Sequence, residues 1–252
     1  MQKRKLGYTA LPNTENSIAL IKKNKRPTEA RQSQRKHAHG RDSEMPQQLD
    51  NRIMNKQKRY ILQENDLPKQ WYNILADMPN KPLPPLNPAT KKPVSVDDLA
   101  HIFAKACAEQ ELDTQNAWID IPEEVQEKYK YYRSTPLVRA YALEEALQTP
   151  AHIYFKNESV NPLGSHKVNS ALPQCYYCKQ EGVTNVTTET GAGQWGAELS
   201  YAASVYGLSA AVYQVKISMQ QKPYRSLVMR TFGAAVTGSP SMSTRAGKNI
   251  IT

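Results

Sequence analysis

The chain has little cysteine and no long apolar run. Three cysteines among 252 residues fit a protein of a reducing compartment. The longest apolar run near the start, residues 18–21, is too short for a membrane span, and no long apolar run follows the first charges as in a secretory signal. We therefore expect a cytoplasmic protein without a membrane association.

Composition limits the architecture. A length of 252 residues allows one large or two small domains, and 39% hydrophobic content is compatible with a packed core. Seventeen prolines and a mean hydropathy of −0.67 indicate much loop. The proline-rich stretch 67–93 is expected to wrap a surface instead of forming regular structure.

The positive charge is concentrated in one segment. The formal net charge is +10, and residues 1–57 hold thirteen Lys and Arg against five acids. This segment is poor in aromatic residues, so we expect a disordered extension. Three interpretations stay open: an arm that binds nucleic acid, a merely solvated or spuriously translated extension, and an organelle transit peptide, which Glu15 and Glu29 disfavour.

Strand-like and helix-like segments alternate in the second half of the chain. This alternation predicts an α/β fold in which a parallel sheet is flanked by helices. We expect three regions: the basic extension 1–57, a proline-rich and helical, irregular region 58–132, and an α/β domain 133–252. The alternating segments are 152–156, 168–181, 185–188, 194–206, 210–217, 220–231 and 234–237.

The first chemical motif is Gly-Ser-His-Lys-Val-Asn at residues 164–169. Ser165 is expected to cap a helix from Lys167 to Gly182, which Pro173 should kink or shorten. The positive potential at a helix start favours the neutral amine, the form in which a lysine attacks a carbonyl group. A single lysine at such a turn is more commonly just exposed, so this motif alone is weak.

The second motif strengthens the first. Residues 185–188 predict a short strand, 190–193 a glycine-rich turn, and 194–206 a helix closed by Gly207. Such a turn gathers backbone N–H groups around one point, where a substrate carboxylate can bind. Glu189 directly precedes the turn and would face the substrate as a general acid and base.

Four motifs together resemble one family. They closely resemble the tryptophan synthase β chain, a pyridoxal-phosphate enzyme of fold type II, and the resemblance covers residues 58–252. Trp195, in place of the usual histidine, and the segments 67–74 and 84–88 resemble the TrpB-like variant. The four motifs are Arg-Ser-Thr-Pro-Leu at 133–137, Gly-Ser-His-Lys at 164–167, Glu-Thr-Gly-Ala-Gly-Gln-Trp-Gly at 189–196 and Gln-Lys-Pro-Tyr-Arg at 221–225.

The resemblance implies a lyase of tryptophan biosynthesis that converts L-serine and indole to L-tryptophan and water through an aminoacrylate on pyridoxal phosphate. Lys167 would hold the cofactor and move the α-proton of serine. Independently of the resemblance, the position of His166 beside this lysine predicts a hydrogen bond to the cofactor phosphate. Glu189 would help to expel the β-hydroxyl and then steady the indole nitrogen. The substrate carboxylate would be held by Thr190, Gly191, Ala192, Gly193 and Gln194.

The family pattern also sets expectations about extent and assembly. The family fold continues with a glycine-rich phosphate loop and a partner for the pyridine nitrogen, and neither occurs before Thr252. We therefore expect a C-terminally truncated copy that is inactive on its own. A full-length protein would form a homodimer, and an α-chain partner is doubtful.

Two other functions remain open. A serine or threonine deaminase uses the same cofactor, although Glu189 and the turn after it match the synthase pattern better. A non-catalytic remnant or a basic nucleic-acid-binding protein is the alternative from another class. Cys175 and Cys178 have C-x-x-C spacing, but without a second ligand pair we expect them to pack within a helix, and we predict no metal site.

Overall fold

Residues 56–251 are described by the structure, which is a computed structural model. By its contacts the chain divides into Met1–Met54 and Asn55–Thr252. The basic extension therefore lies almost entirely outside the described residues, and so do our predictions of its disorder and of nucleic-acid binding.

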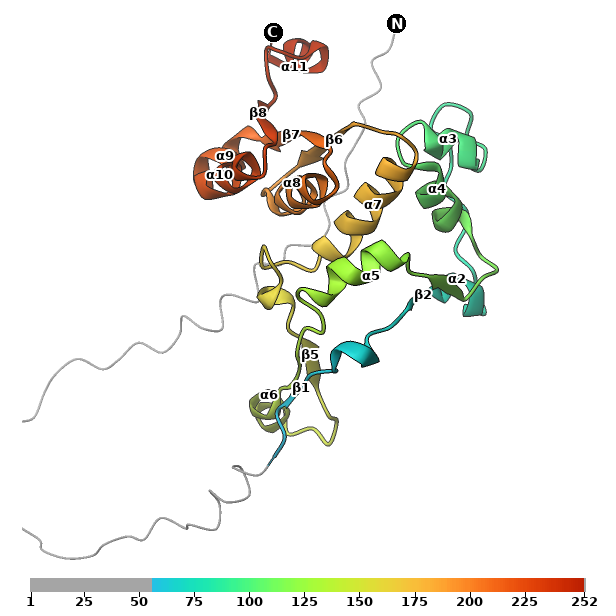
Figure 1. Ribbon diagram of the computed structural model, residues 1–252, viewed down its shortest axis with the longest axis vertical. Coiled ribbons are helices and arrows are strands. Elements are labelled where there is room, and N and C mark those ends of the chain that lie inside the picture. The colour runs from blue at the N-terminus through green and yellow to red at the C-terminus, as the bar shows by residue number, and fades with distance from the viewer. Residues whose placement is uncertain (1–55, 252) are drawn as a thin grey trace, which may run out of the picture. The chain divides into compact units, whose positions relative to one another are not determined.

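A parallel three-stranded sheet carries the second half of the chain (Figure 1). Its order is β6 (Asn185–Thr190), β7 (Ser209–Val215) and β8 (Ala235–Ser239). In the register, Glu189 of β6 lies beside Tyr213 of β7. The predicted parallel sheet is thus confirmed.

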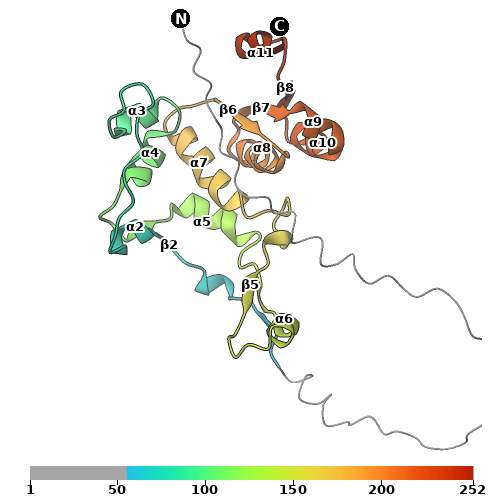
Figure 2. The ribbon, with the colours of Figure 1, turned by 180° about the vertical axis from the view of Figure 1, so that it is seen from behind.

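Helices connect these strands and cover them. The helix α8 (Gln194–Tyr206) joins β6 to β7 and packs on both strands, on α7 (Val168–Gln180) and on α10 (Pro223–Thr231). Figure 2 shows the same arrangement from behind. Between β7 and α10 runs α9 (Lys216–Gln221), and α11 (Arg245–Ile251) follows β8.

The first half of the described chain is built from short elements. Two small antiparallel sheets occur there: β1 (Arg59–Tyr60) with β4 (Leu137–Arg139) and β5 (Tyr154–Lys156), and β2 (Gln70–Tyr72) with β3 (Trp118–Asp120). The helices of this part are α2 (Ile74–Asp77), α3 (Val96–Ala100), α4 (Lys105–Leu112), α5 (Glu123–Lys130), α6 (Tyr141–Ala146), and the 3-10 turns η2 (Glu64–Asp66) and η3 (Glu158–Val160). None of the helices within residues 56–251 is long and apolar enough to cross a bilayer.

Two expectations for this first half were wrong. The strand predicted at 152–156 does not join the parallel sheet, since β5 pairs antiparallel with β4. The stretch 67–93 is not free of regular structure, because it contains β2 and α2. In both cases a partner distant in the sequence decides the structure, and local composition does not reveal that partner.

The core lies between the parallel sheet and the helices α7, α8 and α10. Val168, Leu172, Ala197, Val212 and Met229 are buried there. A Cβ on Gly196 would lie 2.7 Å from Cγ1 of Val212, so the glycine lets α8 approach β7 closely. The small residues of α8 thereby fix the end of β6 and the turn that follows it.

Proline has different effects in two helices. The segment 220–231, predicted as one helix, is divided at Lys222, and Pro223 starts α10. A residue before proline avoids the helical region, whereas proline itself suits a first turn. Pro173 lies inside α7 and does not shorten it, because α7 continues for all thirteen of its residues.

Candidate active site

A pocket of about 460 Å³ lies where α7 begins and β6 ends. It brings together residues that lie more than twenty positions apart in the sequence. Six of the eight predicted site residues line it, and Gly193 and His166 are not among the lining residues. The pocket is lined by Lys167, Ser170, Glu189, Thr190, Gly191, Ala192, Gln194 and Trp195.

Lys167 occupies the N-cap position of α7 and makes no capping bond with its own side chain. Its amine therefore stands at the positive end of a thirteen-residue helix. The predicted cap was displaced by two residues: Ser165 is not the N-cap, but its Oγ accepts a 3.3 Å hydrogen bond from the backbone N–H of Lys167. The end of the helix agrees with the prediction, since Gly182 follows it with a φ of 75°.

The turn after Glu189 leads into α8. Gly193 is its N-cap, with a φ of 92° and no side-chain capping bond. The first N–H groups of a helix lack partners inside the helix, so those that no side chain caps attract an anion. Thr190 fixes the turn, because its buried hydroxyl accepts a 3.2 Å hydrogen bond from the N–H of Gly196. This arrangement is suited to a carboxylate.

The turn packs closely against Arg225 and Gln214 at Gly193. A Cβ there would lie 2.8 Å from Cβ of Arg225 and 3.0 Å from Nε2 of Gln214. The motif at 221–225 therefore packs against the motif at 189–196, although most of α8, all of β7 and most of α9 lie between the two in the sequence. On the other side of the turn, the indole nitrogen of Trp195 donates a 2.9 Å hydrogen bond to the hydroxyl of Thr188.

His166 lies beside a different pocket, of about 620 Å³, together with Trp71, Tyr129 and Asn169. Ser170 lines both this pocket and the one that holds Lys167. The two pockets therefore flank the first turn of α7. The structure does not bring His166 into the lining of the lysine pocket, and its contact with a phosphate stays a prediction.

Hydrogen bonds through Glu158 connect the motif at 133–137 to α7. The buried hydroxyl of Thr135 donates a 2.7 Å hydrogen bond to Oε1 of Glu158. Oε2 of Glu158 accepts one of 3.2 Å from Nδ2 of Asn169, two residues after Lys167. Tyr132 donates to Oδ1 of Asn169 at 3.0 Å. These contacts hold the first turn of α7 in place.

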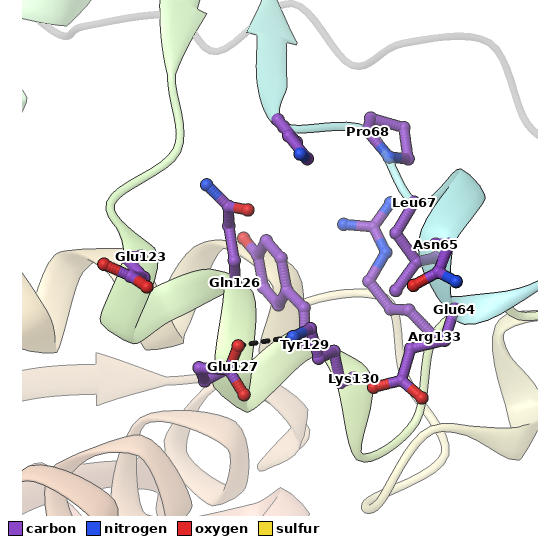
Figure 3. Close-up of a pocket in the computed structure, with 11 residues that line it drawn as sticks. Glu64, Asn65, Leu67, Pro68, Glu123, Gln126, Glu127, Tyr129, Lys130 and Arg133 are labelled. Carbon is purple, nitrogen blue, oxygen red and sulfur yellow. Dashed lines mark hydrogen bonds and ion pairs between the residues drawn. The ribbon is translucent and has the colours of Figure 1, made fainter.

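Arg133, from the same motif, lies in a third pocket of about 450 Å³ (Figure 3). Its guanidinium carbon lies 4.8 Å from the ring centre of Tyr129, between that ring and the segment that holds Leu67 and Pro68. No residue that we predicted for catalysis or substrate binding lines this pocket. We therefore interpret Arg133 as a packing residue of the N-terminal region.

Sequence reasoning missed two residues that line the pocket and one buried acid on α8. Ser170 lies one helical turn after Lys167, so the spacing would have predicted its position. Trp195 was noted only as a variant residue, yet it lines the pocket. Glu198 is completely buried on α8, and no motif in the sequence marks it.

The cysteines lie away from the lysine pocket. Cys175 is buried on α7, and Cys107 and Cys178 are partly buried. Burial raises the pKa of the Cys107 thiol to about 11 and that of Cys175 to about 12, so both thiols stay protonated at neutral pH. Within the described part of the chain, no group of three or more His, Cys, Asp or Glu could hold a metal ion.

A model of a known protein family covers the residues of this pocket. Residues 129–249 match the family model described as pyridoxal-phosphate dependent enzyme. This range includes every residue that lines the lysine pocket.

The curated relatives have more specific names. Tryptophan synthase beta chain 2 of Thermotoga maritima is 53% identical over 190 residues, which are 75% of this chain and 45% of that protein. Tryptophan synthase beta chain 2 of Methanosarcina acetivorans is 48% identical over 199 residues, 79% of this chain and 45% of that one. The chain thus spans less than half the length of these relatives. A solved pyridoxal 5'-phosphate-dependent aspartate racemase is 22% identical with a TM-score of 0.40, covering 50% of this chain and 40% of that one.

The pocket residues fit the cofactor that the family name specifies. Pyridoxal phosphate is an aldehyde, and Lys167 presents a primary amine at the pocket. At Gly191 a Cβ would meet nothing within 4 Å, so the turn leaves open space on that side. An amine, a carboxylate and an anion-binding turn around one space are the groups that amino-acid chemistry on an aldehyde cofactor requires.

Proposed function

We propose that this chain carries the part of a tryptophan synthase β site that binds and activates L-serine. The complete site joins L-serine and indole to give L-tryptophan and water. The observation that carries the proposal is the common pocket of Lys167, Glu189 and the turn 190–194. The relatives' names support the choice of reaction. Pyridoxal phosphate, when bound, supplies the electron sink that stabilises negative charge at the α-carbon of serine.

Lys167 holds the cofactor through its amine and moves the α-proton of serine. Both tasks need the neutral amine for one step and the protonated form for the next. The helix start places positive potential beside the nitrogen. The contacts of Asn169 keep this turn of α7 fixed, which orients the amine toward the pocket.

Glu189 gives a proton to the β-hydroxyl of serine, so that the hydroxyl leaves as water. The same carboxylate then accepts a hydrogen bond from the indole N–H while the indole carbon attacks the β-carbon. Its place at the end of β6, beside the turn that holds the carboxylate of serine, supports both roles. Positioned proton transfer of this kind contributes about a hundredfold to ten-thousandfold in rate.

The turn binds and orients serine. The backbone N–H groups at the start of α8 hold the substrate carboxylate, and Gln194 lines the same pocket. We assign His166 to the cofactor phosphate, with support from its position next to Lys167. The residues that hold the substrate carboxylate are Thr190, Gly191, Ala192, Gly193 and Gln194.

The assembly is proposed from the names of the relatives. We propose that the whole protein of this type works as a homodimer in the cytoplasm. The relatives are named as β chains, and this name is the support for an α-chain partner. Equilibrium sedimentation of the chain, alone and with an α chain, would measure both associations.

Tryptophan formation from L-serine and indole tests the proposal. The 252-residue chain is supplied with pyridoxal phosphate, and labelled product is measured by mass spectrometry. We expect any activity to vanish in Lys167→Ala. Release of pyruvate from serine without tryptophan would instead support a deaminase and contradict the synthase assignment.

A further inference from the structure

The carboxylate of Glu158 accepts hydrogen bonds from three other positions of the chain. Its Oε1 accepts one of 2.7 Å from the hydroxyl of Thr135. Its Oε2 accepts two, from Nδ2 of Asn161 at 2.6 Å and from Nδ2 of Asn169 at 3.2 Å. Glu158 belongs to the turn η3, which precedes the loop that leads to α7. An ionised carboxylate has room for several donors, so this one side chain can fix several segments at once.

The two asparagines lie on either side of Lys167. Asn161 precedes the lysine by six residues, and Asn169 follows it by two. Asn161 also donates a 3.0 Å hydrogen bond to the backbone carbonyl of Ser165, whose Oγ accepts one from the N–H of Lys167. A single oxygen atom, Oε2 of Glu158, therefore holds the lysine segment both before and after the lysine.

These contacts are largely shielded from water, because Thr135, Asn161 and Ser165 are buried. Burial raises the pKa of Glu158, but the hydrogen bonds from Thr135, Asn161 and Asn169 outweigh this effect, and the pKa is lowered overall. Glu158 is thus ionised at neutral pH, and hydrogen bonds to an ionised acceptor are the stronger ones.

The contacts of Glu158 with the lysine segment differ from those that α5 makes. The hydroxyl groups of Tyr129 and Tyr132 also bind this segment, but both do so at Asn169, after the lysine. Glu158 holds it before the lysine as well. Glu158 does not line the lysine pocket, so it can act on the amine through the backbone on both sides of Lys167.

We propose that Glu158 is a positioning residue for Lys167. Its carboxylate keeps the loop before the lysine and the first turn of α7 after it in the arrangement that presents the amine to the aldehyde of pyridoxal phosphate. Misplacing a reacting group by about 1 Å can cost about a hundredfold in rate, so this arrangement matters for the reaction of the amine. The inference rests on the proposed function of Lys167 as the residue that holds the cofactor.

Amide hydrogen exchange of the 252-residue chain tests this restraint without cofactor. We expect Glu158→Met to speed exchange in residues 161–171 by about tenfold or more, because hydrogen bonds on both sides of the lysine are lost. The matched control is Glu144→Met: Glu144 also accepts three hydrogen bonds, two from Arg139 and one from the N–H of Ile153, and none from the lysine segment. Unchanged exchange in 161–171 would overturn the proposal.

The chemistry of the amine gives a second readout. Trapping of Lys167 by pyridoxal phosphate and borohydride depends on how the amine is placed, whereas reductive methylation by formaldehyde depends mainly on its accessibility. We expect Glu158→Met to slow trapping by about tenfold to a hundredfold and to leave methylation unchanged. Glu158→Gln keeps one acceptor oxygen and should restore part of the rate; it also replaces the methionine variant if the latter does not fold.

Three results of the trapping experiment would overturn the proposal. They are unchanged trapping in Glu158→Met, an equal loss of trapping in Glu144→Met, and a loss of trapping that methylation of Lys167 follows to the same extent. The last two would show a general loosening of the fold. If pyridoxal phosphate does not react with Lys167 in the unmodified chain, the proposed function fails, while hydrogen exchange still decides whether Glu158 restrains the lysine segment.

Discussion

The hydroxyl of Tyr129 donates a 2.5 Å hydrogen bond to the backbone carbonyl of Asn169. That carbonyl lies four residues before Pro173, which has no N–H to donate to it. The helix α5 thus supplies the hydrogen bond that proline removes from α7. This explains why α7 continues through a residue that normally ends or kinks a helix.

Tyr129→Phe should therefore destabilise the chain by about 1–3 kcal/mol, the cost of an unsatisfied buried carbonyl. Urea unfolding measures this free energy. In a Pro173→Ala background the helix regains its own donor, so the same tyrosine substitution should cost less. Equal costs in both backgrounds would show that the tyrosine does not compensate for the proline.

Gly193→Ala should damage both stability and substrate binding. The residue has a φ of 92°, and its Cβ would lie 2.8 Å from Cβ of Arg225. We expect a loss of about 1–3 kcal/mol in the free energy of unfolding, as for an overpacked core site. Gly191→Ala is the matched control, because a Cβ there meets nothing within 4 Å. A similar loss in both variants would contradict the packing argument.

The sequence predicts the site better than the N-terminal region, for a physical reason. The strand β6, the turn after it and the helix α8 follow one another in the sequence. Their structure is determined by the glycines and β-branched residues of this short segment itself. The contact of Gly193 with Arg225 and the burial of Glu198 depend on packing between helices that are distant in the sequence. No local pattern encodes such contacts.

The same reason accounts for the errors elsewhere. The strands β2 and β5 are three residues each, and each exists because a distant strand pairs with it. Pro173 was expected to kink or shorten its helix because the rule considers the helix alone, whereas Tyr129 comes from another one. Pro223, by contrast, acts locally, so the division between α9 and α10 was predictable from the sequence.

Glu189→Gln should separate cofactor binding from turnover. The amide keeps the size of the side chain but cannot give a proton to the leaving hydroxyl. We expect trapping of pyridoxal phosphate at Lys167 to persist, while tryptophan formation falls by about a hundredfold or more. Single-turnover measurements of both steps test this. Unchanged tryptophan formation would remove Glu189 from the acid-base role.

Stability should fall as pH rises through neutrality because of Glu198. Its pKa is raised from 4.5 to about 7 in the folded chain, so the folded state binds the proton more tightly than the unfolded state. The favourable contribution is complete below pH 4.5 and is lost as pH rises through about 7. Urea unfolding at several pH values should show this loss in the unmodified chain and not in Glu198→Gln. Parallel curves would contradict it.

The adduct that pyridoxal phosphate forms with this chain tests the central claim most directly. The chain is incubated with the cofactor, reduced with borohydride, digested and mapped by mass spectrometry. The predicted result is modification at Lys167, abolished in Lys167→Ala and retained in Lys179→Ala, whose lysine lies on the same helix but forms a surface ion pair with Glu124. Modification spread over surface lysines, with Lys167 unmodified, would contradict the claim.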